Sequence, residues 1–169
     1  AFQIHSALTE VLKSGTGHMA KEYGLNKFPV AGKTGTAYDF KDDWFIGYTD
    51  KITCVTWAGF DEARTIYPQA FSNQTVLPMW VDVMNQANLI FPAAEIRPPV
   101  AAHPVELCSV SGDRATQYCY HTHMVDGTEQ RIRDGYLEYL KPSMKMERTC
   151  AVHQVGGIVN RDLLRPMTA

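Results

Sequence analysis

The sequence lacks any long apolar run, and its charge is nearly balanced. Its hydrophobic stretches fall far short of the roughly 20 residues that a membrane-spanning helix requires, and no signal-peptide pattern opens the chain. With 16 basic and 18 acidic side chains, the formal net charge is only −2. This balance excludes the basic field that favours nucleic acid, so we expect no nucleic-acid partner. The remaining composition, 45% hydrophobic and 20% charged in 169 residues, is typical of a globular protein with a real core.

Cysteine is scarce, and three of the four cysteines follow a change in composition. The stretch "FPAAEIRPPVAAHP", residues 91–104, has four prolines among fourteen residues and is typical of an extended linker. We therefore predict a folded part over residues 1–91, a Pro-rich linker over 92–104 and a loop-rich, cysteine-containing tail over 105–169. Because an amphipathic helix opens the chain without a lead-in, we also expect the natural protein to extend upstream of Ala1.

The apolar spacing before the linker predicts both helices and strands. Apolar residues recur at helical spacing over residues 2–12 and again over 75–91. Between these helices, residues 28–38, 43–49 and 52–60 are predicted strands, and the last two are joined by a connection short enough for an antiparallel hairpin. The pattern favours an α+β fold, in which an antiparallel sheet packs against helices.

Two sets of side chains in the predicted hairpin admit two interpretations each. The aromatic residues form either a binding platform or, as we favour, part of the core: Trp44, Phe45, Trp57 and Phe60. Asp42 and Asp43 are either paired carboxylates for acid–base work or solvated turn charges. We favour turn charges, since adjacent strand residues face opposite ways.

Two glycines, two threonines and one lysine lie within "GKTGT", residues 32–36. Glycine inside a strand often marks the close approach of another backbone or of a ligand. Lys33, Thr34 and Thr36 would supply a cation and two hydroxyls beside the open backbone at Gly35, a combination that suits a carboxylate joined to an amide. The backbone N–H that follows Gly35 is placed to stabilise an oxyanion in acyl transfer. The competing interpretation is a glycine-bent strand with an exposed lysine.

The wider context resembles the C-terminal part of the transpeptidase domain of penicillin-binding proteins, most closely the class A type. Three segments carry the resemblance in the family's order, within roughly residues 1–90: "AGKTGT", "KDDWFIGYT" and "TWAGFDE". The resemblance implies the penicillin-binding/serine β-lactamase-like fold. It also implies a serine D,D-transpeptidase that cross-links peptidoglycan stem peptides, is acylated by β-lactam antibiotics, and requires no cofactor or metal.

The same resemblance assigns roles to four residues. Lys33 would bind the substrate carboxylate and help to manage protons, and the hydroxyls of Thr34 and Thr36 would bind the same carboxylate. Gly35 completes the substrate-binding motif, and the Thr36 N–H would form half of the oxyanion hole. The implied location is extracytoplasmic, in the periplasm or on the outer face of the cytoplasmic membrane, with an anchor in an upstream segment.

No serine in the sequence has the pattern of an acylated nucleophile. None is followed by lysine at the third position, and no Ser-x-Asn triplet is present. We therefore expect the catalytic serine upstream of Ala1 and an inactive chain on its own. Two alternatives stay open: a β-lactamase or D,D-carboxypeptidase of the same superfamily, and a non-enzymatic module that binds cell wall.

The tail could be interpreted as a zinc site, since Cys-x-x-His supplies two ligands. The candidate ligands are Cys108, Cys119, Cys150 and His153. Their intervals of 11 and 31 residues are irregular for a zinc ribbon. Class A penicillin-binding proteins often end in a similar tail, and an extracytoplasmic enzyme meets an oxidising environment. On that resemblance we favour a disulfide and assign no metal ligand. We prefer the Cys119–Cys150 pair, which closes a long loop and leaves Cys108 near the linker.

Overall fold

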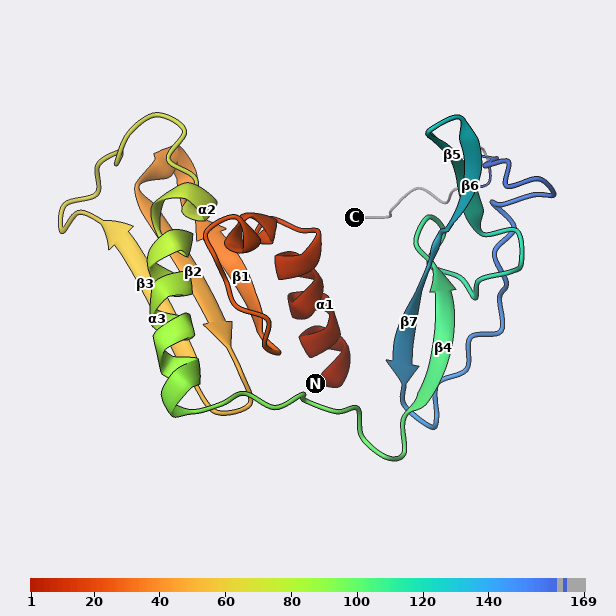
Figure 1. The fold of residues 1–169 in the computed structure, drawn as a ribbon, viewed down its shortest axis with the longest axis horizontal. Helices are drawn as coiled ribbons and strands as arrows, with labels where there is room; N and C mark the ends of the chain where they lie inside the picture. The colour runs from red at the N-terminus through yellow and green to blue at the C-terminus, as the bar shows by residue number, and fades with distance from the viewer. Residues whose placement is uncertain (161–162, 164–169) are drawn as a thin grey trace. The chain divides into compact units, whose positions relative to one another are not determined.

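A computed structural model describes residues 1–160 and residue 163 (Figure 1). The chain divides into two compact units, Ala1–Arg97 and Pro98–Ala169. This division falls inside the predicted Pro-rich linker, although the first strand of the second unit already begins at His103. Helices and antiparallel strands are both present, as the α+β prediction requires. No helix in the described part of the chain is both long and apolar enough to cross a membrane.

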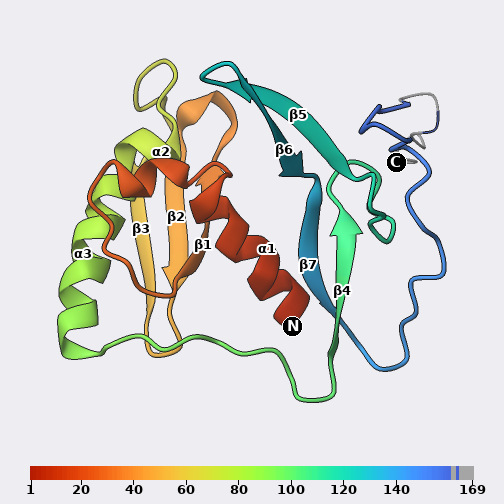
Figure 2. The same cartoon turned by 45° about the vertical axis from the view of Figure 1, so that its right-hand side comes forward.

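The first unit is a three-stranded antiparallel sheet with helices on one face (Figure 2). The strand order is β1-β2-β3, with Lys33 opposite Ile46 and Trp44 opposite Trp57. The predicted hairpin is the β2–β3 pair. The elements, in chain order, are α1 (Phe2–Lys13), the 3₁₀ turn η1 (His18–Lys21), β1 (Ala31–Thr36), the 3₁₀ turn η2 (Tyr38–Phe40), β2 (Asp42–Tyr48), β3 (Thr53–Gly59), α2 (Ser72–Thr75) and α3 (Leu77–Ile90).

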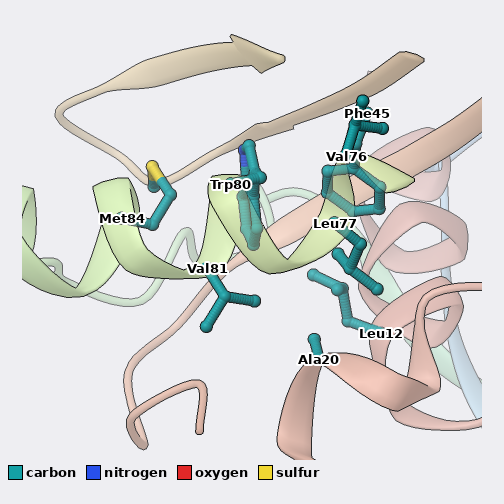
Figure 3. Packing of buried hydrophobic residues seen from close by; sticks show 8 residues of the cluster. All are labelled: Leu12, Ala20, Phe45, Val76, Leu77, Trp80, Val81 and Met84. Carbon is teal, nitrogen blue, oxygen red and sulfur yellow. The ribbon is translucent and has the colours of Figure 1, made fainter. Parts of the chain in front are cut away.

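A single apolar cluster joins the helices to the sheet (Figure 3). Phe45 of β2 and Trp80 of α3 are fully buried, and their ring centroids lie 4.7 Å apart. Gly47 is required on the same strand, because a Cβ there would overlap the Trp80 ring. The cluster takes residues from α1, η1, β2 and the α2–α3 region: Leu12, Ala20, Phe45, Val76, Leu77, Trp80, Val81 and Met84.

The opposite face of the sheet is exposed, and this corrects part of the predicted core. Of the four aromatic residues that we placed there, only Phe45 is buried, whereas Trp44 and Trp57 are each 41% exposed and Phe60 is 38% exposed. Side chains alternate across a strand, so Trp44 must face away when its neighbour Phe45 faces the helices. Because the helices of the first unit cover one face only, Trp44 and Trp57 pair with each other, with centroids 6.0 Å apart.

Over its described residues, the second unit contains two separate antiparallel strand pairs. β4 (His103–Cys108) pairs with β7 (Gly135–Leu140), and β5 (Tyr120–Val125) pairs with β6 (Thr128–Arg133). The β5–β6 turn is Asp126-Gly127, both at positive φ, as a tight two-residue hairpin requires. Every residue of β6 is exposed, which explains why the sequence shows little strand periodicity here.

Candidate functional site

The Lys-Thr-Gly-Thr segment lies on β1, an edge strand of the sheet. β1 pairs with β2 on one side, and no strand in the described part of the chain pairs with its other side. Lys33 and Thr36 are exposed, and Thr34 and Gly35 are half-buried. A Cβ at Gly35 would approach only the Trp44 side chain, at 3.4 Å. The Lys33–Thr36 part of this edge therefore has no strand partner among the described residues, and an extended peptide can pair with it.

The Lys33 ammonium is held beside two threonine hydroxyls. Its Nζ donates to the Thr34 carbonyl oxygen at 2.9 Å and to Thr34 Oγ1 at 3.2 Å. Thr34 Oγ1 also hydrogen-bonds Thr16 Oγ1 at 2.7 Å, from the segment that links α1 to η1. Although Lys33 and Thr34 alternate across the strand, the flexible lysine stem brings the charge to the hydroxyl. One cation and two hydroxyls thus gather at one point on the strand edge.

Thr36 belongs to a second, partly buried network at the end of the strand. Its Oγ1 lies 2.6 Å from Ser72 Oγ and accepts a bond from the Ser72 N–H at 3.3 Å. Ser72 Oγ also lies 2.7 Å from the Gly35 carbonyl oxygen and 3.0 Å from Asp43 Oδ1. Thr75 Oγ1 donates to the other Asp43 oxygen at 2.6 Å. These bonds fix α2 against the end of β1.

Asp43 corrects the interpretation of this residue as a solvated turn charge. It is fully buried, and its carboxylate accepts bonds from hydroxyls of α2. The cause is alternation: Asp43 shares the helix-covered face with Phe45, two residues on. Asp42 faces the other way and accepts a bond from Trp57 Nε1 at 2.9 Å. The two carboxylates therefore do not act together.

A pocket of about 330 Å³ adjoins both hydroxyl groups of the motif. The Asn73 Oδ1 atom is buried and has no hydrogen-bond partner in the described part of the chain. Because the Thr34 hydroxyl in this wall lies 3.2 Å from Lys33 Nζ, the pocket is chemically suited to a ligand that carries an anion. Its lining consists of Thr16, Thr34, Thr36, Phe71, Ser72 and Asn73.

Ser72 lines the pocket but lacks the setting of a nucleophile. It is 1% exposed, and its hydroxyl is occupied by Thr36, Gly35 and Asp43. In residues 1–160 no hydrogen bond joins a serine to a lysine or a histidine, the arrangement that activates a serine for acyl transfer. No spacing in the sequence predicts the supporting role of Ser72. That role depends on a contact across 36 residues.

The cysteines divide between the units. Cys54 lies in β3 of the first unit, where burial raises the pKa of its thiol. Cys108, Cys119 and Cys150 lie together in the second unit, and all four are free thiols, so the expected disulfide is not formed in this structure. A fourth side chain, His153, completes the group.

No family model matches the chain. The relatives found by sequence are penicillin-binding proteins. The penicillin-binding protein 1A of Rickettsia bellii is 40% identical over 115 residues, or 68% of this chain. That of Rickettsia typhi is 36% identical over 111 residues, or 66% of this chain, and that of Pseudomonas aeruginosa is 38% identical over 87 residues, or 52%. The chain spans about 14% of the length of both Rickettsia relatives and 10% of the Pseudomonas protein.

A solved structure extends the likeness to the fold. The crystal structure of penicillin-binding protein 1A from Haemophilus influenzae superposes with a TM-score of 0.70 at 22% identity. The match covers 88% of this chain and 21% of that chain. The architecture is thus the α+β fold of the transpeptidase type. The sequence relatives place the chain in the penicillin-binding protein family.

Proposed function

We propose that the first unit forms one wall of the active site of a serine D,D-transpeptidase that cross-links peptidoglycan stem peptides. The observation that carries the proposal is the Lys33 ammonium, held within 3.2 Å of the Thr34 hydroxyl on an open strand edge. A cation beside a hydroxyl is a receptor for a carboxylate, and the strand edge is a receptor for the peptide backbone next to it. A peptide that ends in a free carboxylate satisfies both.

Each residue of the motif then has a task in substrate binding or catalysis. Lys33 and Thr34 hold the terminal carboxylate of the stem peptide, while Thr36 adds its hydroxyl at the far end of the same pocket wall. Gly35 keeps the backbone accessible to the peptide. The backbone N–H of Thr36 stabilises the oxyanion that develops on the scissile carbonyl. Ser72 positions this end of the strand through its bond to Thr36, and Asp43 holds Ser72 by accepting a bond from its hydroxyl.

The nucleophile in this proposal is a serine from a part of the polypeptide that precedes Ala1. Its Oγ attacks the carbonyl of the D-Ala–D-Ala bond, forms an acyl-serine ester and releases the terminal D-alanine. An amine from a neighbouring stem then attacks the ester, which forms the cross-link and restores the serine hydroxyl. A β-lactam enters the same step, because its ring amide takes the place of the scissile bond. The reaction takes place outside the cytoplasmic membrane, where peptidoglycan lies.

A fluorescent penicillin tests this proposal directly. The 169-residue chain alone should carry no covalent label after denaturing electrophoresis, whereas the polypeptide extended upstream should be labelled. Labelling of the chain alone would contradict the assignment of the serine to another segment. If the extended polypeptide hydrolyses stem peptides but never joins two of them, water resolves the acyl-enzyme, and the enzyme is a D,D-carboxypeptidase instead.

A further inference from the structure

Four metal-ligating side chains converge in the second unit, away from the Lys33 strand in the sequence. Cys108 ends β4, Cys119 directly precedes β5, and Cys150 and His153 lie in the irregular segment after β7. Their ligand atoms all lie within 4.8 Å of one another. None of the four residues is more than 5% exposed. Three thiols and one imidazole therefore share a single enclosed space.

The distances within this group match a tetrahedral metal site. His153 Nδ1 lies 3.3 Å from Cys108 Sγ and 3.5 Å from Cys150 Sγ. With zinc–sulfur bonds of about 2.3 Å and a zinc–nitrogen bond of about 2.0 Å, tetrahedral angles separate sulfur from nitrogen by roughly 3.5 Å. We propose that Cys108, Cys119, Cys150 and His153 bind one structural zinc ion. This proposal does not depend on the proposed function of the first unit.

A carboxylate sets the tautomer of His153 that such a site needs. The Nε2 of His153 lies 3.1 Å from Asp134 Oδ2, on the side of the ring away from the sulfurs. Asp134 Oδ1 in turn bonds His121 Nδ1 at 2.7 Å. With its proton on Nε2 and directed at Asp134, the imidazole presents the Nδ1 lone pair to the metal. Asp134 is thus a positioning residue, and it does not touch the ion.

Backbone N–H groups point at two of the sulfurs. The N–H groups of Val110 and Ser111 donate to Cys108 Sγ at 3.4 and 3.5 Å. The N–H of Thr116 donates to Cys119 Sγ at 3.2 Å. Donors directed at sulfur stabilise the thiolate, the form that binds metal. The turn after Cys108 closes through Gly112, whose φ of 73° few other residues adopt without strain.

The fold brings the ligands together from distant parts of the sequence. Arg114 forms isolated bridges to Leu107 on one side and Thr149 on the other, which places Cys108 and Cys150 next to each other. The N–H of Asp134 donates to the Cys119 carbonyl oxygen at 2.9 Å and joins the third cysteine to the positioning carboxylate. A disulfide would use only two of the three thiols and leave the third buried beside the imidazole. Four ligands around one ion leave none unused.

Metal analysis of the whole 169-residue chain tests the proposal. The chain, purified with zinc present, should contain one zinc ion per molecule. After chelation and reduction, it should bind one cobalt(II) ion with the visible absorption of a tetrahedral thiolate complex. Cys119→Ser and Cys150→Ser should weaken cobalt binding at least tenfold, while Cys54→Ser, which removes the cysteine of the first unit, should leave it unchanged. A chain that binds neither metal after reduction, or that holds an intact disulfide between two of these cysteines, would overturn the proposal.

A second variant tests the geometry without removing a ligand. Asp134→Asn should lower zinc affinity by about 10- to 100-fold, measured by competition with a chromophoric chelator, because the imidazole loses its orienting carboxylate. The matched control is His123→Asn, which changes an exposed histidine of the β5–β6 hairpin and should have no effect. Equal affinity in Asp134→Asn and the parent chain would contradict the role assigned to Asp134.

Discussion

The two units bury different kinds of side chain. The first unit surrounds Trp80 and Phe45 with apolar residues from α1, η1 and the α2–α3 region, a core in which hydrophobic burial is the main stabilising contribution. The corresponding cluster of the second unit consists of Cys108, Cys119, Cys150 and Val152. Small units with little apolar core generally depend on a cross-link or a metal. The second unit is therefore organised around its sulfur atoms, whereas the first unit, which carries the candidate active-site wall, is organised around apolar packing.

The units also differ in how they use polar side chains. In the first unit the buried carboxylate of Asp43 is satisfied by hydroxyls, and the network ends at the exposed motif strand. In the second unit the polar network runs from His121 through Asp134 to His153 and ends at the cysteines. One network presents hydroxyls to a pocket, and the other presents a nitrogen to three sulfurs.

Removal of the metal should have the largest effect on the difference in stability between the two units. A strong chelator should release the second unit from its folded state and leave the first unit intact, because only the second would lose its organising centre. Structural zinc in small domains contributes on the order of 10 kcal/mol to folding. Hydrogen-exchange mass spectrometry should therefore show loss of protection over residues 103–140 and none over α3. Loss of protection in both units alike would contradict the division.

Truncation of Trp80, the largest buried side chain of the first unit, should destabilise the first unit and leave the second unit folded. Trp80→Ala should destabilise the first unit by about 3–5 kcal/mol, the cost of removing a fully buried aromatic side chain. Chemical denaturation followed by circular dichroism measures the change. Trp57→Ala is the matched control, since this tryptophan is 41% exposed on the other face and should cost much less. Metal content should remain at one ion per chain in both variants.

Loss of the motif cation should alter chemistry without altering either core. In the polypeptide extended upstream, Lys33→Ala should slow acylation by a fluorescent penicillin by roughly two orders of magnitude or more, as expected when a preorganised transition-state contact is removed. Thr34→Val should mainly weaken the binding of ligands with a free carboxylate. Lys21→Ala, at an exposed lysine of η1, is the control for charge alone. If the Lys33→Ala variant is acylated at the parent rate, the role assigned to Lys33 is wrong.

The smallest expected effect is the pH dependence of one hydrogen bond within the first unit, between Asp50 and Ala94. The Asp50 carboxylate accepts the Ala94 N–H at 2.8 Å, and this bond, followed by the contact with Lys51, lowers the Asp50 pKa below its ordinary value of 3.8. The stabilising contribution is therefore fully present above pH 3.8 and is lost as the pH falls through the folded-state pKa. The Ala94 amide resonance should titrate below pH 3.8 in the NMR spectrum. It should not titrate in Asp50→Asn.

Much of the first unit follows from local sequence. Alternation and a short connection predict the β2–β3 hairpin, and helical spacing predicts α1 and α3. The glycine-rich strand around Lys33 can be predicted as a binding segment, because its residue types are unusual for a strand in any context. These signals lie within a few residues of one another, so no knowledge of distant contacts is needed.

Only the tertiary structure decided which face of the sheet is covered and which side chains meet across long intervals. Strand alternation tells that Asp43 and Trp44 face opposite ways, but the position of the helices decides that Asp43 is buried and Trp44 exposed. The partner of Thr36 lies 36 residues away, and the cysteines are separated by 11 and 31 residues of irregular chain. Such contacts depend on how the intervening loops fold back, and residue spacing alone does not predict the path of a loop. The sequence therefore determined the strand, the hairpin and the ligand types, while the closure of the chain determined the pocket and the four-ligand cluster.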